Sequence, residues 1–211
     1  MKVFIVGSTG RVASNLIKNL VDRGHEVFAG ARQIERVVKM DHVHPVHLDL
    51  HADVDVISEA IDSVDAVYFV AGSRGKDLLQ TDAFGAVKVM QAAEKNGIKR
   101  FIMLSSMYSL EPEQWHRRGL DQLTNYNIAK FFADNYLVNQ TNLDYTILQP
   151  TTLVEEKGSG KVSIGTATNS TNSIENVADV LAAILDADNT IGKVIMMSDG
   201  NDEIGAALAE I

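Results

Sequence analysis

The stretch VFIVGSTGRVA, from Val3 to Ala13, decides the fold of this chain. Its apolar beginning, residues 3–6, predicts a buried strand that runs straight into a glycine-containing turn. Gly7 permits a tight turn off the strand, and Gly10 lets a phosphate approach the backbone. A helix begins next, and its unpaired N–H groups and positive dipole end attract anions. This order of strand, turn and helix start predicts a cradle for the pyrophosphate of a dinucleotide. The residues assigned to the cradle are Gly7, Thr9, Gly10, Arg11 and Val12.

The helix after the turn supports this interpretation. Its apolar residues recur at helical spacing, and Gly24 ends the pattern. The glycine spacing is GxxGxxA rather than GxGxxG, with Ala13 where a third glycine is expected. One methyl group there requires only slightly wider packing of the helix on the strand. A lone glycine pattern can also mark an ordinary surface turn, but the flanking strand and amphipathic helix favour a cofactor site.

The end of the second predicted strand, residues 26–30, indicates which dinucleotide is bound. Folds that select NAD place an acidic residue here to accept the ribose 2′-hydroxyl proton, whereas this chain continues Gly30-Ala31-Arg32. A guanidinium suits a 2′-phosphate, and Arg11 or Arg36 could assist from neighbouring helix starts. An arginine at this place could also simply cover the surface. Because the carboxylate is missing, we expect NADP to be preferred, with NAD possible.

Composition limits the range of functions. With 211 residues and 45% apolar content, the chain can bury one substantial core. A net charge of −9 without a cluster of Lys or Arg argues against nucleic acid and favours a small-molecule substrate. The absence of cysteine excludes disulfides, thiolate metal sites and cysteine nucleophiles. The sequence shows no signal peptide and no apolar run of membrane-spanning length, so we expect a cytoplasmic protein without membrane contact.

Strands and helices alternate along the whole chain, which predicts a doubly wound parallel sheet of the Rossmann type. We expect residues 1–211 to form a single NAD(P)-binding Rossmann domain with small C-terminal loops on the substrate side. The polar stretch 155–173 predicts a long loop or hairpin at the carboxyl edge of the sheet, where ligands bind. Further strands are predicted at 43–48, 65–70, 99–105, 143–148 and 193–197, and helices at 53–62, 76–96, 121–140, 174–186 and from 201.

Four polar residues are candidates for chemistry. Tyr126 and Lys130 are four apart on a predicted helix and therefore share one face, where an ammonium would favour the phenolate. Taken alone, this pair is common on helix surfaces. The strand before the helix ends in Ser105 and Ser106, which brings hydroxyls to the same carboxyl edge, as a donor to a substrate carbonyl requires.

Seven motifs in order along the chain carry a family resemblance. They are GSTGRVA at 7–13, GAR at 30–32, LDL at 48–50, VAGS at 70–73, LSSMYS at 104–109, YNIAK at 126–130 and LDYTILQP at 143–150. Together they resemble an atypical short-chain dehydrogenase/reductase of the NAD(P)H-binding group, which includes biliverdin-IXβ reductase-like and NmrA-like proteins. The resemblance covers essentially the whole chain.

The resemblance implies a role for each matching position. Asp49 and Leu50 would meet the adenine, and Ala71 and Gly72 would pass beneath the adenosine ribose and pyrophosphate. Lys130 would hold the nicotinamide ribose, and residues from Pro150 onward would line the nicotinamide pocket. Ser106, with Ser105 second, would polarise the substrate carbonyl, while Tyr126 would donate or take the proton. The family often has an arginine before the proline, where this chain has Gln149, and the chain lacks the substrate-binding extension of larger epimerases and dehydratases.

These features favour a reductase of a small carbonyl, quinone, flavin-like or tetrapyrrole-like acceptor, with hydride supplied by NADP(H). The alternative is a non-catalytic redox sensor or regulator that binds NADP(H) while Tyr126 stays idle. A sugar-nucleotide epimerase or dehydratase is a third possibility, disfavoured by the missing extension.

Two further sets of residues have more than one interpretation. Histidines around the third strand, at 42, 44, 47 and 51, have a spacing that a metal site could use. No partner ligand is fixed elsewhere, so we predict no metal centre. The apolar pattern of the helix 76–96 fits burial on the sheet, and part of it could face a second subunit in a homodimer.

Overall fold

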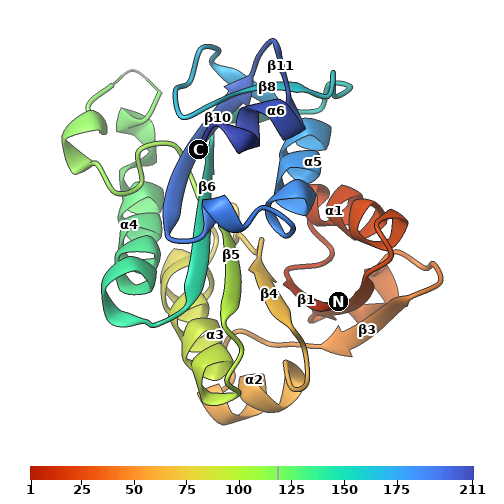
Figure 1. Cartoon of the computed structure of the whole chain (residues 1–211). Helices are drawn as coiled ribbons and strands as arrows, with labels where there is room; N and C mark the ends of the chain where they lie inside the picture. Colours follow the sequence, from red (N-terminus) through yellow and green to blue (C-terminus); the bar gives the residue numbers. More distant parts are fainter. Residues whose placement is uncertain (118) are drawn as a thin grey trace.

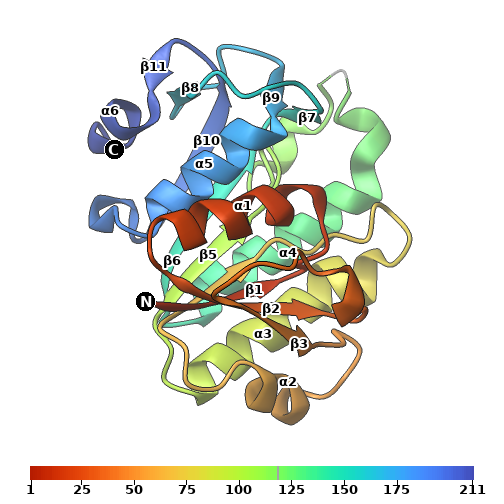
Figure 2. The same ribbon diagram turned by 90° about the vertical axis from the view of Figure 1, so that its right-hand side faces the viewer.

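The computed structural model describes residues 1–117 and 119–211. In this part of the chain nine strands form one sheet in the order β11-β8-β10-β6-β5-β4-β1-β2-β3, and β7 and β9 form a separate pair (Figure 1). Helices cover both faces of the large sheet, with α1 and α5 on one side and α2, α3 and α4 on the other (Figure 2). The expected doubly wound, mostly parallel Rossmann-type sheet is therefore confirmed.

The seven strands from β10 to β3 in this order are all parallel to their neighbours within the run. These strands are β1 Lys2–Val6, β2 Glu26–Ala31, β3 Val43–His47, β4 Ala66–Phe69, β5 Arg100–Leu104, β6 Asp144–Pro150 and β10 Lys193–Asp199. The α-helices are α1 Arg11–Asp22, α2 Val54–Ala60, α3 Phe84–Lys95, α4 Thr124–Gln140, α5 Ile174–Ile184 and α6 Ile204–Ala209. Five short helical turns are η1 Ile34–Arg36, η2 Leu78–Ala83, η3 Pro112–Gln114, η4 Asp121–Leu123 and η5 Asp188–Thr190.

The segment 155–173, predicted as a long loop or hairpin, contains strand structure that does not form a hairpin between neighbouring strands. It contains β8 Lys161–Ile164, which is antiparallel to β10, and is bordered by β7 Thr152–Val154 and β9 Thr171–Ser173. The strand β11, Asp202–Glu203, pairs with β8 at the end of the sheet. These strands are too short to show a readable alternation, although Val162 is fully buried.

The predicted helix 76–96 was wrong in its first part. The chain forms the π-helical turn η2 before α3 begins at Phe84. A π-turn has no distinct apolar period, so the sequence pattern merged it with the α-helix.

Successive strand residues alternate between two cores. Ile5 and Tyr68 pack with α1 and α5, while Phe4 and Phe69 pack with α2, α3 and α4, and all four side chains are fully buried. Because both faces of the central strands are covered, these strands are apolar along their whole length. The Tyr68 hydroxyl donates to the Leu181 carbonyl at 2.9 Å and so ties β4 to α5.

The chain enters the sheet at β1, builds β2 and β3 on one side, and then returns to β4 on the other side of β1. At such a reversal the two connections leave the sheet in opposite directions and open a crevice at its carboxyl edge. The crevice holds the site described below. Among the residues described, none of the helices is both long and apolar enough to cross a membrane.

Candidate active site

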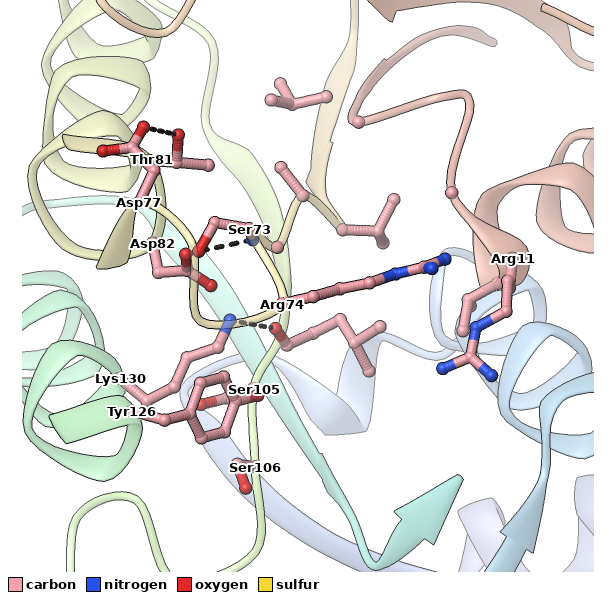
Figure 3. A pocket seen from close by; sticks show the side chains of 18 of the residues that line it. Arg11, Ser73, Arg74, Asp77, Thr81, Asp82, Ser105, Ser106, Tyr126 and Lys130 are labelled. Atoms are coloured by element: carbon pink, nitrogen blue, oxygen red, sulfur yellow. Dashed lines mark hydrogen bonds between the residues drawn. The ribbon is translucent and has the colours of Figure 1, made fainter. Parts of the chain in front are cut away.

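A cavity of about 850 Å³ runs along the carboxyl edge of the sheet (Figure 3). Its size falls within the range of small-molecule and cofactor sites. Every residue that the sequence analysis assigned to the cofactor or to the chemistry lines this cavity. The fold therefore brings the predicted site residues together, although their individual roles stay predictions.

Gly7 forms the turn between β1 and α1 in a way that other residues would not allow. Its φ is +88°, and an added Cβ would lie 2.6 Å from the Ala71 Cα. The turn is pinned to the end of β2, because the backbone N–H groups of Gly7 and Ser8 and the Ser8 hydroxyl all donate to the Gly30 carbonyl. The β1, β2 and β4 ends are thus held close together at the predicted pyrophosphate cradle.

The start of α1 faces this cradle. Gly10 is the extended N-cap of the helix, and no side chain of the described chain caps it. The N–H groups of the first turn have no partner within a helix and are available to an anion. Ala13, in the first turn of α1, is buried, so the methyl group in place of the third glycine fits the packing. These observations match the donor set that a pyrophosphate needs.

The part of the cavity near the end of β2 is basic. Arg32 follows directly after β2, is exposed, and lines the cavity together with Arg36. Asp49 lies beside them, where its carboxylate accepts the His51 backbone N–H at 3.0 Å. Arg11 also lines the cavity, and its guanidinium is paired with Glu155 at 2.8 Å. Arg32 and Arg36 are the principal candidates for the predicted 2′-phosphate contact.

Arg74 is a cavity residue that the sequence analysis missed. It lies in the loop between β4 and η2 with φ +54°, next to Gly75 with φ +80°. Its side chain extends across the cavity toward Arg11 (Figure 3). The dipeptide Arg-Gly in a short polar loop is the local signal that could have identified a left-handed turn here. Arg74 adds a cation to a site whose surrounding chain carries a net charge of −9.

Asp82, in the π-helical turn η2, is a second missed residue. It is fully buried, and its Oδ2 accepts the Ser73 backbone N–H at 3.0 Å. Its Oδ1 and the Ser73 hydroxyl lack hydrogen-bond partners among the described residues, and both residues line the cavity. Earlier in the same turn, hydrogen bonds from Thr81 and His51 hold the pKa of the Asp77 carboxyl below its usual value. π-Turns occur often at functional sites, and this one presents polar groups to the cavity.

Tyr126, Lys130 and Ser106 lie toward one end of the cavity in the view of Figure 3. The Lys130 ammonium is almost fully buried, donates to the Leu104 carbonyl at 3.2 Å, and lies 5.9 Å from the centre of the Tyr126 ring. Tyr126 and Ser106 are half-buried. The expected pairing of a tyrosine with a lysine on one helix face beside a serine is present.

Ser105 differs from Ser106 in its partners. It lines the cavity, but its hydroxyl donates to the carboxylate of Asp134, a fully buried residue one turn after Lys130. In this structure the Ser105 proton is therefore directed at a buried carboxylate. Asp134 was absent from the sequence analysis, because its partners Ser105 and Ser109 lie 29 and 25 residues away in the chain and no local pattern on α4 marks it.

The histidines near β3 take part in ordinary pairings. His44 contacts Glu26 at 2.9 Å and stacks on Phe28, and His51 contacts Asp77 at 2.6 Å. Among residues 1–117 and 119–211, no three acidic, histidine or cysteine side chains converge as metal ligands.

Comparisons with known proteins agree with the fold and with NAD(P)H as the cofactor. A family model described as NAD(P)H-binding matches residues 7–188. The solved structure of the oxidoreductase ylbE from Lactococcus lactis is 46% identical, with a TM-score of 0.97 over 100% of this chain and 96% of that one. The uncharacterized sugar epimerase YhfK of Bacillus subtilis is 32% identical, and the match covers 100% of both proteins.

A more distant structure shares the fold. The wide-type short-chain dehydrogenase/reductase from Veillonella parvula, solved in complex with NADP, is 19% identical, with a TM-score of 0.80 over 94% of each chain. The predicted resemblance to an NAD(P)H-binding group is confirmed by the family match.

Proposed function

Because this chain belongs to the NAD(P)H-binding family, we propose that it is an NADP(H)-dependent oxidoreductase that reduces a small carbonyl, quinone or flavin-like acceptor. One observation carries the proposal: a single cavity joins the dinucleotide cradle to Ser106, Tyr126 and Lys130. The similar Lactococcus lactis protein is described as an oxidoreductase, which supports the same reaction class.

Different residues along the cavity bind the cofactor and the acceptor. The α1 N-terminus and the Gly7 turn bind the pyrophosphate, and Lys130 holds the ribose nearest the reacting carbon. The bound cofactor supplies a hydride, so the main contribution of the protein is to position the acceptor beside it. Ser106 orients the oxygen of the acceptor, and Tyr126 donates the proton that this oxygen takes up.

The preference for NADP rests on the basic end of the cavity. Arg32 follows the end of β2, where NAD-selective folds place a carboxylate, and Arg36 lines the same cavity. NADP is the ligand in the Veillonella parvula structure. We expect Arg32→Ala to lower NADPH affinity on the order of tenfold, since one charge-assisted contact is lost, and to leave NADH affinity unchanged.

Cofactor choice is measured by titrating the purified protein with NADPH and NADH while following nicotinamide fluorescence. Arg23→Ala is the matched control, because Arg23 is an exposed arginine paired with Asp186 and lies outside this cavity. Equal affinity of the wild type for both nucleotides would remove the NADP preference, and binding of neither would remove the proposed function.

Turnover is tested with NADPH and three probe acceptors: 9,10-phenanthrenequinone, menadione and FMN. We expect Tyr126→Phe to lower kcat on the order of 100-fold, because a general acid is lost. Tyr136→Phe is the control, since this tyrosine is on the same helix with its hydroxyl bonded to Gln91. NADPH binding without oxidation by any acceptor, together with an unchanged Tyr126→Phe protein, would favour the redox sensor.

An epimerase is the second candidate, and the name of the Bacillus subtilis relative supports it. Such an enzyme would keep its nucleotide through purification and convert a sugar nucleotide without net oxidation. Nucleotide retained through gel filtration, with no NADPH consumed in the acceptor assays, would favour this reaction.

The net charge of −9 supports a small molecule, and not nucleic acid, as the binding partner. We expect a small-molecule substrate rather than nucleic acid or a membrane, a cytoplasmic location, and association into a homodimer.

A further inference from the structure

Asp134 is a buried acid that the proposed reaction does not yet use. It lies on α4 with no solvent exposure, between the helix and the carboxyl ends of β5 and β6. Its Oδ2 accepts the hydroxyl protons of both Ser105 and Ser109, while its Oδ1 has no hydrogen-bond partner among the described residues. A carboxylate this deeply buried is expected to have a function or a full set of partners.

The two serines differ in what lies on their other side. Ser105 lines the cavity, whereas Ser109 is outside its lining and is fully buried. The Ser109 oxygen accepts a hydrogen bond from the Gln149 side-chain amide at 2.7 Å. Because Ser109 is outside the cavity lining, a reversal of its hydrogen bond would not direct a proton into the cavity. Ser105 is therefore the serine through which a proton from Asp134 can reach the cavity.

The charges around Asp134 allow both of its protonation states. Burial raises the pKa of Asp134 to about 6, opposed by the hydrogen bonds from Ser105 and Ser109 and by the Lys130 ammonium one turn earlier. Gln149, which faces the network from β6, is neutral, so it does not hold the carboxyl ionised as a cation there would. Lys130 itself points to the Leu104 carbonyl (Figure 3).

We propose that Asp134 is a one-proton store that delivers its proton through the Ser105 hydroxyl to Tyr126. When Asp134 is ionised, the Ser105 hydroxyl donates inward to it, as observed. When Asp134 is protonated, it donates to the Ser105 oxygen, and the Ser105 proton turns toward the cavity. This inference rests on the proposed function.

The proton balance closes in four transfers. Tyr126 gives its proton to the acceptor oxygen as the acceptor carbon receives a hydride from the reduced nucleotide. The resulting phenolate takes the Ser105 proton, directly or through one water, and Ser105 takes the proton of Asp134. The carboxylate left behind is stabilised by Lys130. After the product leaves, water in the cavity returns one proton to Asp134 along the same path. Transfer from a carboxyl to a phenolate is downhill, because a phenol ordinarily has the higher pKa.

The test compares two serines that donate to the same oxygen. The measurement is kcat against pH with NADPH and 9,10-phenanthrenequinone, for the wild type and for Ser105→Ala, Ser109→Ala and Asp134→Asn. For the wild type we expect kcat to fall as the pH rises through about 6, because Asp134 then loses its proton. For Ser105→Ala and Asp134→Asn we expect a kcat at the acid end lowered on the order of 100-fold and no fall with pH. For Ser109→Ala we expect the fall in kcat to remain and to move to higher pH. The Asp134 carboxylate then lacks the hydrogen bond from Ser109, but its proton can still pass through Ser105.

The outcomes distinguish failure of the proton transfer from Asp134, called the relay below, from failure of the proposed reductase function. Identical pH profiles for Ser105→Ala and Ser109→Ala, or an Asp134→Asn profile equal to that of the wild type, would overturn the relay while leaving the reductase in place. No NADPH oxidation by the wild type would overturn both. The two serine variants keep the test decisive if Asp134→Asn fails to fold.

Discussion

At position 7, one methyl group would disturb both the fold and the cofactor cradle. The added Cβ would lie 2.6 Å from Ala71, and the backbone has φ +88°, so Gly7→Ala combines a steric clash with left-handed strain. We expect Gly7→Ala to lower the free energy of unfolding by about 3 kcal/mol or more and to abolish nucleotide binding.

Urea unfolding gives the free energy, and Gly24→Ala is the control. Gly24 has a similar φ of +82°, but a Cβ added there would meet no atom within 4 Å, so its substitution carries the strain without the contact. We expect it to cost about 1 kcal/mol. Equal losses for the two variants would mean that contact with Ala71 contributes nothing.

Asp134 also makes stability depend on pH. The pKa of its carboxyl is about 6 in the folded chain against an ordinary value of 3.8, so the unfolded chain loses this proton first as the pH rises. The contribution of this group to stability is fully present below 3.8 and is lost as the pH rises through about 6. Relative to Asp134→Asn, we expect the wild type to lose about 2 kcal/mol between pH ~4.5 and pH ~7.

The measurement is the difference in unfolding free energy between the two proteins across that range, which cancels the titration of all other groups. A constant difference would contradict the raised pKa of Asp134.

At the scale of elements, Arg100 joins three parts of the chain. Its guanidinium, largely buried, donates to the Asp144 carbonyl and the Thr146 hydroxyl of β6 at 2.8 Å each. It also donates to the Ile184 carbonyl at 2.9 Å and to Thr190 at 3.2 Å, which ties α5 and η5 to the sheet. We expect Arg100→Met to destabilise the protein by about 3 kcal/mol, because four acceptors lose this donor and three of these hydrogen bonds are buried.

The effect is measured as the shift in denaturation midpoint. Arg23→Met is the control, since Arg23 and Asp186 form an exposed pair at 3.2 Å and its loss is expected to cost less than about 1 kcal/mol. A loss for Arg100→Met no larger than for Arg23→Met would show that these bonds contribute little.

The sequence could predict the elements whose signal is local. The central strands were readable because both of their faces are buried, which makes residues 3–6 of β1, 66–69 of β4 and 101–104 of β5 continuous apolar runs. The strands β8 and β9 were not, because three or four residues are too few to show a period, and β9 consists only of Thr, Asn and Ser. The turn η2 was missed for a related reason: it packs against α3 and α4, and no pattern within its own sequence marks it.

The candidate site divides in the same way. The glycine turn and Arg32 are recognisable because they adjoin a strand in the sequence. The Asp134 network joins residues 105, 109, 134 and 149, and only folding brings them together. Arg11 shows the converse, because its pairing with Glu155, 144 residues away, could not be anticipated from a helix start.

For the whole molecule, exposed apolar side chains predict self-association. Leu79 and Phe84 are 75% and 55% exposed at η2 and the start of α3, and Ile128 and Phe132 are 37% and 61% exposed on the neighbouring α4. Apolar side chains gathered on adjacent helices mark an interaction surface. We expect a homodimer, and we expect Phe132→Asp to convert it to a monomer.

Sedimentation equilibrium gives the mass in solution. Val56→Asp is the control, because Val56 is 56% exposed on α2, away from this surface. A monomeric wild type, or a dimer that survives Phe132→Asp, would remove the proposed interface.

The order of the strands also determines where a further chain cannot attach. The pairing of Val27 N–H with the His42 carbonyl and of Leu48 N–H with the Ala31 carbonyl turns the backbone groups of the even-numbered residues of β3 toward β2. The backbone of Pro45 therefore faces outward at one end of the sheet, where it offers no N–H to an incoming strand. At the other end β11 has only two residues, both acidic. Both borders thus resist strand addition, which protects the protein against sheet-to-sheet aggregation and leaves the helices as the surfaces through which copies can meet.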